Sequence, residues 1–231
     1  MPSSTWIESK KKVEPVKKSM ALVDWIRENR ETFWGGVAIV AAVIAFAIFF
    51  SVSYSKVQKN AWQALFMAQQ NSYAGNMDES KKIIADLVNN YGRSSAVPFA
   101  LMLDGDIDFA KGQYEEAEQS YSKALKKAES QLEPVLLFNI AKTYEARRNW
   151  DEAIKKYEDF LKKYPGHYTA PEVHTNLAIV FARSGKAAES KAAFEKITVL
   201  YPDTEWAEQA KATLNPAPVS EGKTEGNKAK K

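Results

Sequence analysis

The sequence predicts an all-α protein, in which an α-solenoid of about four helical hairpins and a capping helix follows a single transmembrane helix. Three observations support this fold class. Residues 32–55 contain no charged side chain. Beyond them, a pattern of small, aromatic and turn-forming residues recurs about every 37 residues. Helical periodicity also dominates residues 57–214, where no strand-like alternation of apolar and polar residues competes with it.

The uncharged stretch has the length and composition of a membrane span. With its apolar core from Phe33 to Phe50, it is long enough to cross a hydrocarbon layer of about 30 Å at about 1.5 Å per residue. Trp34 and Tyr54 lie near its ends, where aromatic rings favour the membrane interface. It lacks the polar face of a soluble helix, and it is longer than a signal-peptide core of about 7–15 residues. We therefore expect a retained anchor.

Basic residues are distributed unequally around this span. Seven of them precede it: Lys10, Lys11, Lys12, Lys17, Lys18, Arg27 and Arg30. Only Lys56 and Lys59 follow closely. Because basic flanks stay on the cytoplasmic side, the sequence predicts a single-pass protein with a cytoplasmic N-terminus and a solenoid across the membrane. For a bacterial source this means the inner membrane and a periplasmic solenoid. Apolar residues ahead of the span predict a short interfacial helix: Met20, Leu22, Val23, Trp25 and Ile26.

The repeat is clearest at a small residue in the second helix of each hairpin. This residue is Ser80, Ala117, Ala153 or Ser190. Helix ends repeat as well, at Tyr91-Gly92, Tyr164-Pro165 and Tyr201-Pro202, where glycine or proline disfavours further helix. A period of this size indicates stacked supersecondary units that share one continuous core.

The repeated pattern resembles the tetratricopeptide repeat (TPR) over residues 57–214. The second repeat carries Gly105, Gly112, Tyr114, Ala117, Tyr121 and Ala124. The third carries Ala141, Tyr144, Trp150, Ala153, Tyr157 and Pro165. The fourth carries Ala178, Phe181, Gly185, Phe194 and Pro202, and the more divergent first carries Ala68, Gly75 and Leu87.

The resemblance implies a concave groove, lined by the first helix of each hairpin, that binds protein partners. Carried over to this sequence, the groove positions are Trp62, Leu65, Gln69, Tyr73, Phe99, Met102, Asp106, Phe109, Phe138, Lys142, Glu145, Thr175, Ile179 and Arg183. The set is rich in aromatic residues and methionine, which commonly anchor interfaces. A competing interpretation is that several of these side chains pack against the neighbouring repeat.

One short stretch suggests a different function. Asp104, Asp106, Asp108 and Glu115 have the acidic spacing of a calcium-binding EF-hand loop. Such a loop requires glycine at its sixth position, where this sequence has Phe109. We therefore expect no calcium site, and the repeat register predicts helix through residues 104–110.

Asp104 and Asp108 nevertheless occupy positions where the family usually has apolar residues. They lie four residues apart and so share a helix face. We expect a slightly rotated helix that exposes both carboxylates, because burying them without a partner is costly. The alternative is an acidic docking point for a basic residue of a partner.

Composition excludes several other functions. The chain has no cysteine, so it has neither a disulfide framework nor a thiolate zinc site. Its two ends carry the excess of basic residues and the folded part is nearly neutral, which disfavours nucleic acid as a partner. No catalytic motif is present, so we expect no enzyme, no cofactor and no metal. An enzyme that uses the cluster of Asp104, Asp106 and Asp108 remains a competing hypothesis.

The predicted organisation has four parts: a disordered basic N-terminus (1–18), an interfacial helix with the anchor (19–56), the solenoid (57–214) and a disordered tail (215–231). An anchored TPR array resembles the ancillary subunit family of the Sec translocon, which implies a span in contact with an inner-membrane complex and a groove that binds periplasmic chaperones or secreted chains. The closing Tyr-Pro pattern also resembles the TPR module of the cell-division coordinator. The alternative function is a scaffold for cell-wall synthesis, cell division or outer-membrane assembly.

Overall fold

A computed structural model describes residues 17–216, with side chains from residue 23 onward. The chain divides into two compact units between Lys56 and Val57, and each is described here by itself. No strand occurs in the part of the chain that the structure describes. The predicted disorder of residues 1–18 and 215–231 falls almost entirely outside the described residues. At its inner edge the N-terminal segment is helical, because α1 begins at Lys17.

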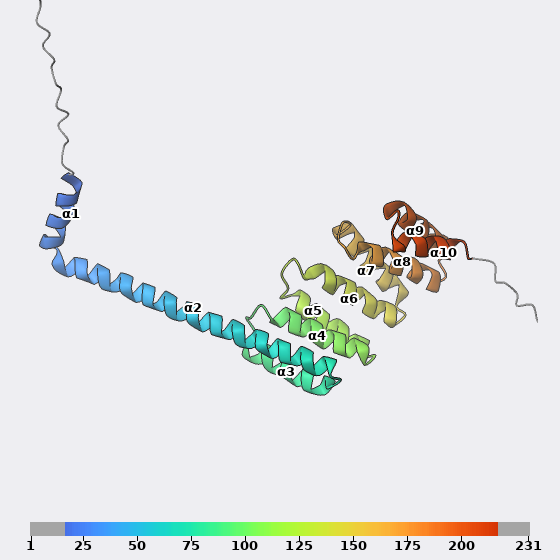
Figure 1. The fold of residues 1–231 in the computed structure, drawn as a ribbon, viewed down its shortest axis with the longest axis horizontal. Coiled ribbons are helices and arrows are strands. Elements are labelled where there is room, and N and C mark those ends of the chain that lie inside the picture. Colours follow the sequence, from blue (N-terminus) through green and yellow to red (C-terminus); the bar gives the residue numbers. More distant parts are fainter. Residues whose placement is uncertain (1–16, 217–231) are drawn as a thin grey trace, which may run out of the picture. The chain divides into compact units, whose positions relative to one another are not determined.

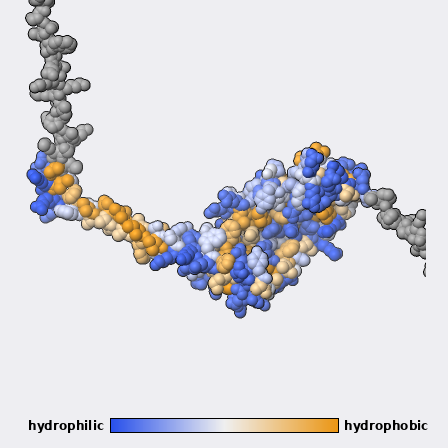
Figure 2. All heavy atoms as spheres, in the orientation of Figure 1, coloured by the Kyte–Doolittle hydropathy of each residue, from blue (hydrophilic) through white to orange (hydrophobic). Residues whose placement is uncertain are grey.

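Two helices begin the described chain, α1 (Lys17–Glu28) and α2 (Arg30–Tyr73) (Figure 1). Asn29 separates them, and its side-chain amide donates a hydrogen bond to the carbonyl oxygen of Trp25 at 3.1 Å. The first part of α2 is long and apolar enough to cross a membrane, and none of its apolar window is buried. Figure 2 shows hydrophobic residues along this part.

The helix α2 contains more than the predicted span. It continues without interruption to Tyr73 and therefore also supplies the first helix of the solenoid. The sequence does not reveal this continuity, because the residues that follow the apolar stretch change in polarity while remaining compatible with a helix.

Beyond α2 the chain forms helices of similar length. They are α3 (Met77–Asn90), α4 (Val97–Ala110), α5 (Tyr114–Leu125), α6 (Glu133–Ala146), α7 (Trp150–Lys163), α8 (Ala170–Arg183), α9 (Ala187–Leu200) and α10 (Glu205–Leu214). The end of α2 pairs with α3, and three further hairpins follow, α4–α5, α6–α7 and α8–α9. Helix α10 packs against α9 and α8. The predicted solenoid of four hairpins with a capping helix is therefore confirmed.

The turn inside each hairpin needs a residue with positive φ. Glycine supplies it in three hairpins, at Gly75 (φ 83°), Gly112 (φ 75°) and Gly185 (φ 78°). In the third hairpin Arg148 takes this conformation with φ 59°. A side chain makes the left-handed region unfavourable, so the α6–α7 turn is the strained member of the set.

The recurring small residue packs where the two helices of a hairpin cross. Ala117 and Ala153 are fully buried there. In the first and last hairpins serine occupies this position, and its hydroxyl donates to a carbonyl oxygen of the facing helix. Ser80 Oγ bonds Ala68 O at 2.8 Å, and Ser190 Oγ bonds Ala178 O at 2.8 Å. These hydrogen bonds satisfy the hydroxyl groups, so either serine or alanine can occupy this buried position of the repeat.

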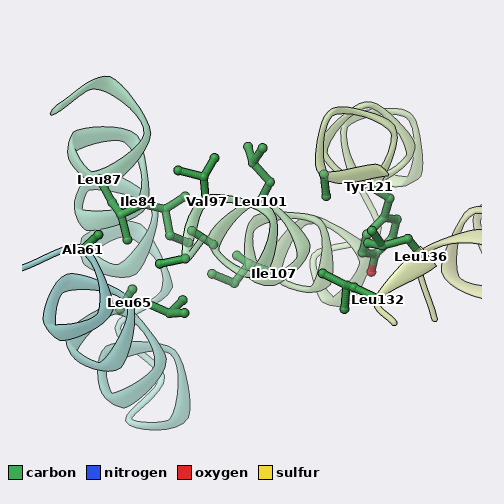
Figure 3. Packing of buried hydrophobic residues seen from close by; sticks show 14 of the residues in the cluster. Ala61, Leu65, Ile84, Leu87, Val97, Leu101, Ile107, Tyr121, Leu132 and Leu136 are labelled. Carbon is green, nitrogen blue, oxygen red and sulfur yellow. The ribbon is translucent and has the colours of Figure 1, made fainter. Parts of the chain in front are cut away.

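A continuous core joins successive hairpins. Leu65, Ile84 and Val97 belong to one cluster of buried residues that reaches from α2 to α6 (Figure 3). Within it, Gly105 allows the ring of Tyr121 to lie against α4, since a Cβ atom at Gly105 would stand 2.6 Å from the ring. This distance is shorter than any comfortable contact, so the glycine is needed for the packing.

The expectation that Asp104 and Asp108 are exposed is wrong. Asp108 is only 2% exposed. Lys81 of α3 places its Nζ 2.5 Å from Asp108 Oδ1 and 3.2 Å from Asp104 Oδ1. The hydroxyl of Ser120 donates to Asp104 at 2.8 Å. A lysine from the preceding hairpin thus compensates both carboxylates, which removes the reason to rotate the helix outward. Neither carboxylate is a free docking point.

The prediction of helix over residues 104–110 is confirmed, because these residues lie in α4. A regular helix prevents the three aspartates of the EF-hand-like stretch from converging on one metal ion. Asp104 and Asp108 pair with Lys81, whereas Asp106 accepts a hydrogen bond from Tyr121.

Candidate functional site

Two neighbouring hollows lie along the first helices of the second, third and fourth hairpins. One has a volume of about 200 Å³ and is lined by Asp106, Phe109, Tyr121, Asn139 and Lys142. The other, of about 330 Å³, is lined by Phe109, Lys142, Glu145, Ala146, Arg148, Trp150, Glu172, Asn176 and Arg183. They share two residues, so we treat them as one feature, the polar groove.

Lys142 of α6 stands between the two hollows. Its ammonium nitrogen lies 5.8 Å from the ring centroid of Phe109 and 5.4 Å from that of Phe138, within the range of cation–π attraction. Among residues 23–216 no carboxylate comes within ion-pair distance of this nitrogen. The two rings therefore position a lysine whose charge is still available to a ligand.

Asp106 forms the acidic side of the first hollow. Its carboxylate accepts a hydrogen bond from the hydroxyl of Tyr121 at 2.7 Å. Desolvation raises the pKa of Asp106, although the bond from Tyr121 and the charge of Lys142 act in the opposite direction. Burial and the neighbouring carboxylate raise the pKa of Tyr121, so the phenol stays protonated and remains the donor.

Glu145 is the corresponding acid of the second hollow. It accepts hydrogen bonds from the hydroxyl of Tyr157 at 2.7 Å and from Nη1 of Arg183 at 2.9 Å. Burial is the main reason for the raised pKa of Tyr157, and the charge of Glu145 adds to it. A neutral phenol and a cation thus hold the carboxylate, and it is oriented before any ligand binds.

A third hollow lies near the start of the solenoid and has a different character. It measures about 260 Å³ and is lined by Trp62, Ser95, Pro98, Phe99, Lys127, Glu129, Gln131 and Leu132. The rings of Trp62 and Phe99 are 5.4 Å apart, and Trp62 Nε1 donates to Ser95 Oγ at 3.3 Å. We call this hollow the aromatic pocket.

The structure brings together about half of the predicted groove residues. Asp106, Phe109, Lys142, Glu145 and Arg183 meet in the polar groove, and Trp62 and Phe99 meet in the aromatic pocket. Two others belong to the core, since Leu65 is 2% and Phe138 7% exposed. Of these, Phe138 still reaches the ammonium of Lys142.

The remaining predicted residues lie outside the three hollows: Gln69, Tyr73, Met102, Thr175 and Ile179. Thr175 uses its hydroxyl on its own helix, donating to the carbonyl oxygen of Pro171 at 3.0 Å. Met102 and Ile179 pack against the core clusters. Tyr73 is 87% exposed at the end of α2.

Two polar residues of the groove do not appear among the predicted positions, Asn139 of α6 and Asn176 of α8. They are separated by one repeat length, so a search for polar side chains at the repeat period would have found them. Carboxamides both donate and accept hydrogen bonds, and they can therefore bind the backbone of a peptide of any sequence.

The fold and the groove define a solenoid of helical hairpins with an open polar binding surface. The sequence matches the family model of the tetratricopeptide repeat-like domain over residues 24–196, well over half of the chain. The chain therefore belongs to this family. No curated protein matches the sequence significantly.

Solved structures with the same fold include other TPR proteins. A tetratricopeptide repeat protein from Parabacteroides merdae aligns with a TM-score of 0.58 at 17% identity, over 68% of this chain and 59% of that one. The present chain thus spans less than two thirds of that relative. A double mutant of MamA RS-1 aligns with a TM-score of 0.54 at 14% identity, over 67% of this chain and 80% of that one. TPR-like repeats of a putative kinesin light chain from Podospora anserina align with a TM-score of 0.56 at 13% identity, over 68% of this chain and 84% of that one.

Proposed function

We propose that this protein is a membrane-anchored adaptor that binds a segment of a partner protein in the polar groove. One observation carries the proposal. Lys142 lines two open hollows, lies beside two aromatic rings and forms no ion pair within the described residues. A polar groove with pre-positioned charges favours a specific protein ligand, because its groups are already oriented before the ligand binds.

The chemistry of the groove suggests how a peptide segment would bind. Asn139 and Asn176 would bind peptide groups, Lys142 would attract an acidic group, and Asp106 would accept from a donor. The groove is not proposed as an active site. Asp104 and Asp108 pair with Lys81, whereas Asp106 accepts from Tyr121, which argues against an acid–base centre shared by the three.

In this proposal the adaptor is held at a membrane. The support is the apolar part of α2 together with the excess of basic residues ahead of it, which favours a cytoplasmic N-terminus and a solenoid across the bacterial inner membrane. The resemblance to the ancillary Sec-translocon subunits suggests the translocon as the complex beside the span. Periplasmic chaperones or secreted chains are then the proposed partners of the groove.

Site-specific photo-crosslinking in cells tests the groove. A photoreactive phenylalanine analogue at Phe109 reports on the polar groove, and the same analogue at Tyr168, which is 81% exposed and lines neither hollow, is the matched control. We expect partner adducts at position 109 that are missing at position 168. Identical adducts at both positions would contradict binding in the groove.

A second probe at Val43 tests the setting of the anchor. Translocon subunits as its adducts would support the translocon adaptor. Cell-wall synthases or division proteins would instead favour the scaffold function. Protease added to intact spheroplasts should degrade the solenoid, and a protected solenoid would show that the proposed orientation is wrong.

A further inference from the structure

The outward side of α2 in the solenoid unit is rich in large apolar side chains, and most of it is left uncovered by the described helices. We define the α2 face by the residues Lys59, Trp62, Gln63, Phe66, Met67, Gln70 and Tyr73. The first five line a broad hollow of about 660 Å³. Phe66 is 60%, Met67 57% and Tyr73 87% exposed, although these are among the largest apolar side chains of the solenoid.

The two ends of the solenoid differ in this respect. At the C-terminal end α10 covers the last hairpin (Figure 1). Its Trp206 and Leu214 pack onto the cluster around Phe194. At the N-terminal end α4 reaches the edge of the α2 face at Trp62, whose ring lies against Phe99, and Phe66, Met67 and Tyr73 stay exposed. Solenoids need a polar outer surface on their terminal helices to remain soluble, so an apolar terminal face indicates an interface.

We propose that the α2 face binds the α2 face of a second copy of this chain, in a symmetric homodimer. The first argument is area. A large side chain offers about 150–250 Å², so the exposed parts of Trp62, Phe66, Met67 and Tyr73 amount to about 500 Å² in one copy. Two copies would bury about 1,000 Å² from these side chains alone, and stable interfaces bury about 1,200–2,000 Å² in total. The surrounding glutamines would supply the rest.

The second argument is self-complementarity. A two-fold interface sets each residue against the same patch of the partner copy, so like charges would repel. The α2 face carries no acidic residue and only one basic residue, Lys59. Its other polar residues, Gln63 and Gln70, are carboxamides, which can donate to and accept from an identical group. A strongly charged partner would find almost no opposite charge on the α2 face, whereas a second copy of this face is equally uncharged and matches it.

The helix geometry places these side chains on one stripe. Phe66 and Tyr73 are two turns apart and Gln70 lies between them, so the three project from the same side of α2. This side differs from the one buried in the solenoid, where Ala61, Leu65 and Ala68 pack. Dimer formation therefore requires no rearrangement of the hairpin core.

Disulfide trapping tests the dimer cleanly, because the chain has no cysteine of its own. Full-length protein carrying Gln70→Cys, in native membranes, is exposed to a mild oxidant and separated without reductant. Glu189→Cys on the exposed side of α9 is the control. We expect a band at twice the chain mass for position 70 at a yield at least tenfold above position 189. Equal yields at the two positions would overturn the proposal.

Side-chain substitutions identify the contact. In the Gln70→Cys background, Phe66→Ser with Met67→Ser should lower the disulfide yield at least fivefold. Tyr168→Ser, which removes a more exposed aromatic ring elsewhere, should leave it unchanged. An unchanged yield in the double variant would overturn the proposal.

A photoreactive residue at Gln63 distinguishes other occupants of the α2 face. Adducts of twice the chain mass support the dimer, and adducts of another mass, or none, contradict it. Loss of partner adducts at Phe109 would not affect this test.

Discussion

The first two hairpins and the last two place their charges in opposite ways. Between α3 and α4 the charges are inside, where Lys81 neutralises Asp108, and large rings such as Phe66 are outside. Between α6 and α8 the rings of Tyr157 and Phe160 are fully buried, and the ion pair of Arg183 with Glu145 lies at the surface of the groove.

This difference separates two tasks within one repeated fold. Ion pairs that lie inside cannot contact a ligand, and the surface around them is free to be apolar and to bind an apolar partner. Where the ion pairs lie at the surface, the core is built of apolar side chains and aromatic rings, and the groove is polar. The same hairpin geometry therefore supports an apolar end and a polar middle, and the substitutions below test each half.

The largest expected effect concerns the internal charges. Lys81→Met leaves Asp108 buried without a cation, which should lower the free energy of unfolding by about 3 kcal/mol at neutral pH, the lower end for a broken buried pair because Lys81 is partly exposed. Lys82→Met, which removes only a surface pair with Glu79, should change it by less than about 0.5 kcal/mol. Urea denaturation monitored by circular dichroism measures both.

The double variant Lys81→Met with Asp108→Leu separates charge from packing. It should recover most of the lost stability, since an apolar pair can replace a buried ion pair at little cost. If the double variant were as unstable as Lys81→Met alone, the loss would be due to packing around the lysine stem.

The next effect concerns the last hairpin, whose buried titratable group is neutral. Burial, aided by the charge of Lys196, lowers the pKa of His174 from its ordinary 6.5 to about 4. As the pH falls below 6.5, the unfolded chain takes up the proton before the folded one, so stability is complete above pH 6.5 and declines toward pH 4. The loss should reach about 2–3 kcal/mol at pH 4.

His174→Phe should remove this part of the acid sensitivity, because phenylalanine does not titrate and can keep the ring contact with Tyr201. Unfolding midpoints in urea between pH 4 and pH 7 measure the slope. If the variant and the native sequence lost stability in parallel over this range, other groups would be responsible.

A smaller effect tests the polar half directly. Lys142→Met should lower the yield of partner adducts at the Phe109 probe about tenfold, equivalent to about 1.4 kcal/mol, because it removes the available cation of the groove. Lys186→Met, which removes a lysine paired with Asp151 at the surface, is the matched control and should have no effect. Equal losses in both variants would indicate that general charge attracts the partner.

The smallest effect concerns the strained turn. Arg148→Gly should raise the free energy of unfolding by about 0.5–1 kcal/mol, since glycine relieves the left-handed strain but adds freedom to the unfolded chain. The equivalent reverse change, Gly112→Arg in the second hairpin, should lower stability by about 1 kcal/mol. Thermal unfolding resolves both, and a loss of stability in Arg148→Gly would show that the arginine side chain contributes contacts of its own.

The sequence predicts the fold well because the repeat enforces it. Small residues at a constant period, turn glycines and closing prolines each have one structural meaning, and together they define the hairpins. The site is predicted less completely. Leu65 and Phe138 occupy groove positions of the family but turn toward the core, and a pattern alone cannot distinguish the two sides of a helix that packs on several neighbours.

The internal ion pair is absent from the sequence pattern for a related reason. Its lysine, Lys81, comes from another hairpin than Asp104 and Asp108, and no short-range pattern links them. The continuity of α2 is not visible in the sequence either, because a helix carries no signal at the point where its surroundings change. Both depend on contacts between distant segments.

The packing of Gly105 has a consequence for the evolution of ligand preference. By lacking a side chain, it lets the ring of Tyr121 cross against α4 and present its hydroxyl to Asp106 at the wall of the groove. A residue that no ligand touches therefore determines how an acidic group is displayed to ligands. Selection for a new partner could begin at this hidden position, and a designer who wished to change what the groove prefers could leave every lining side chain as it is.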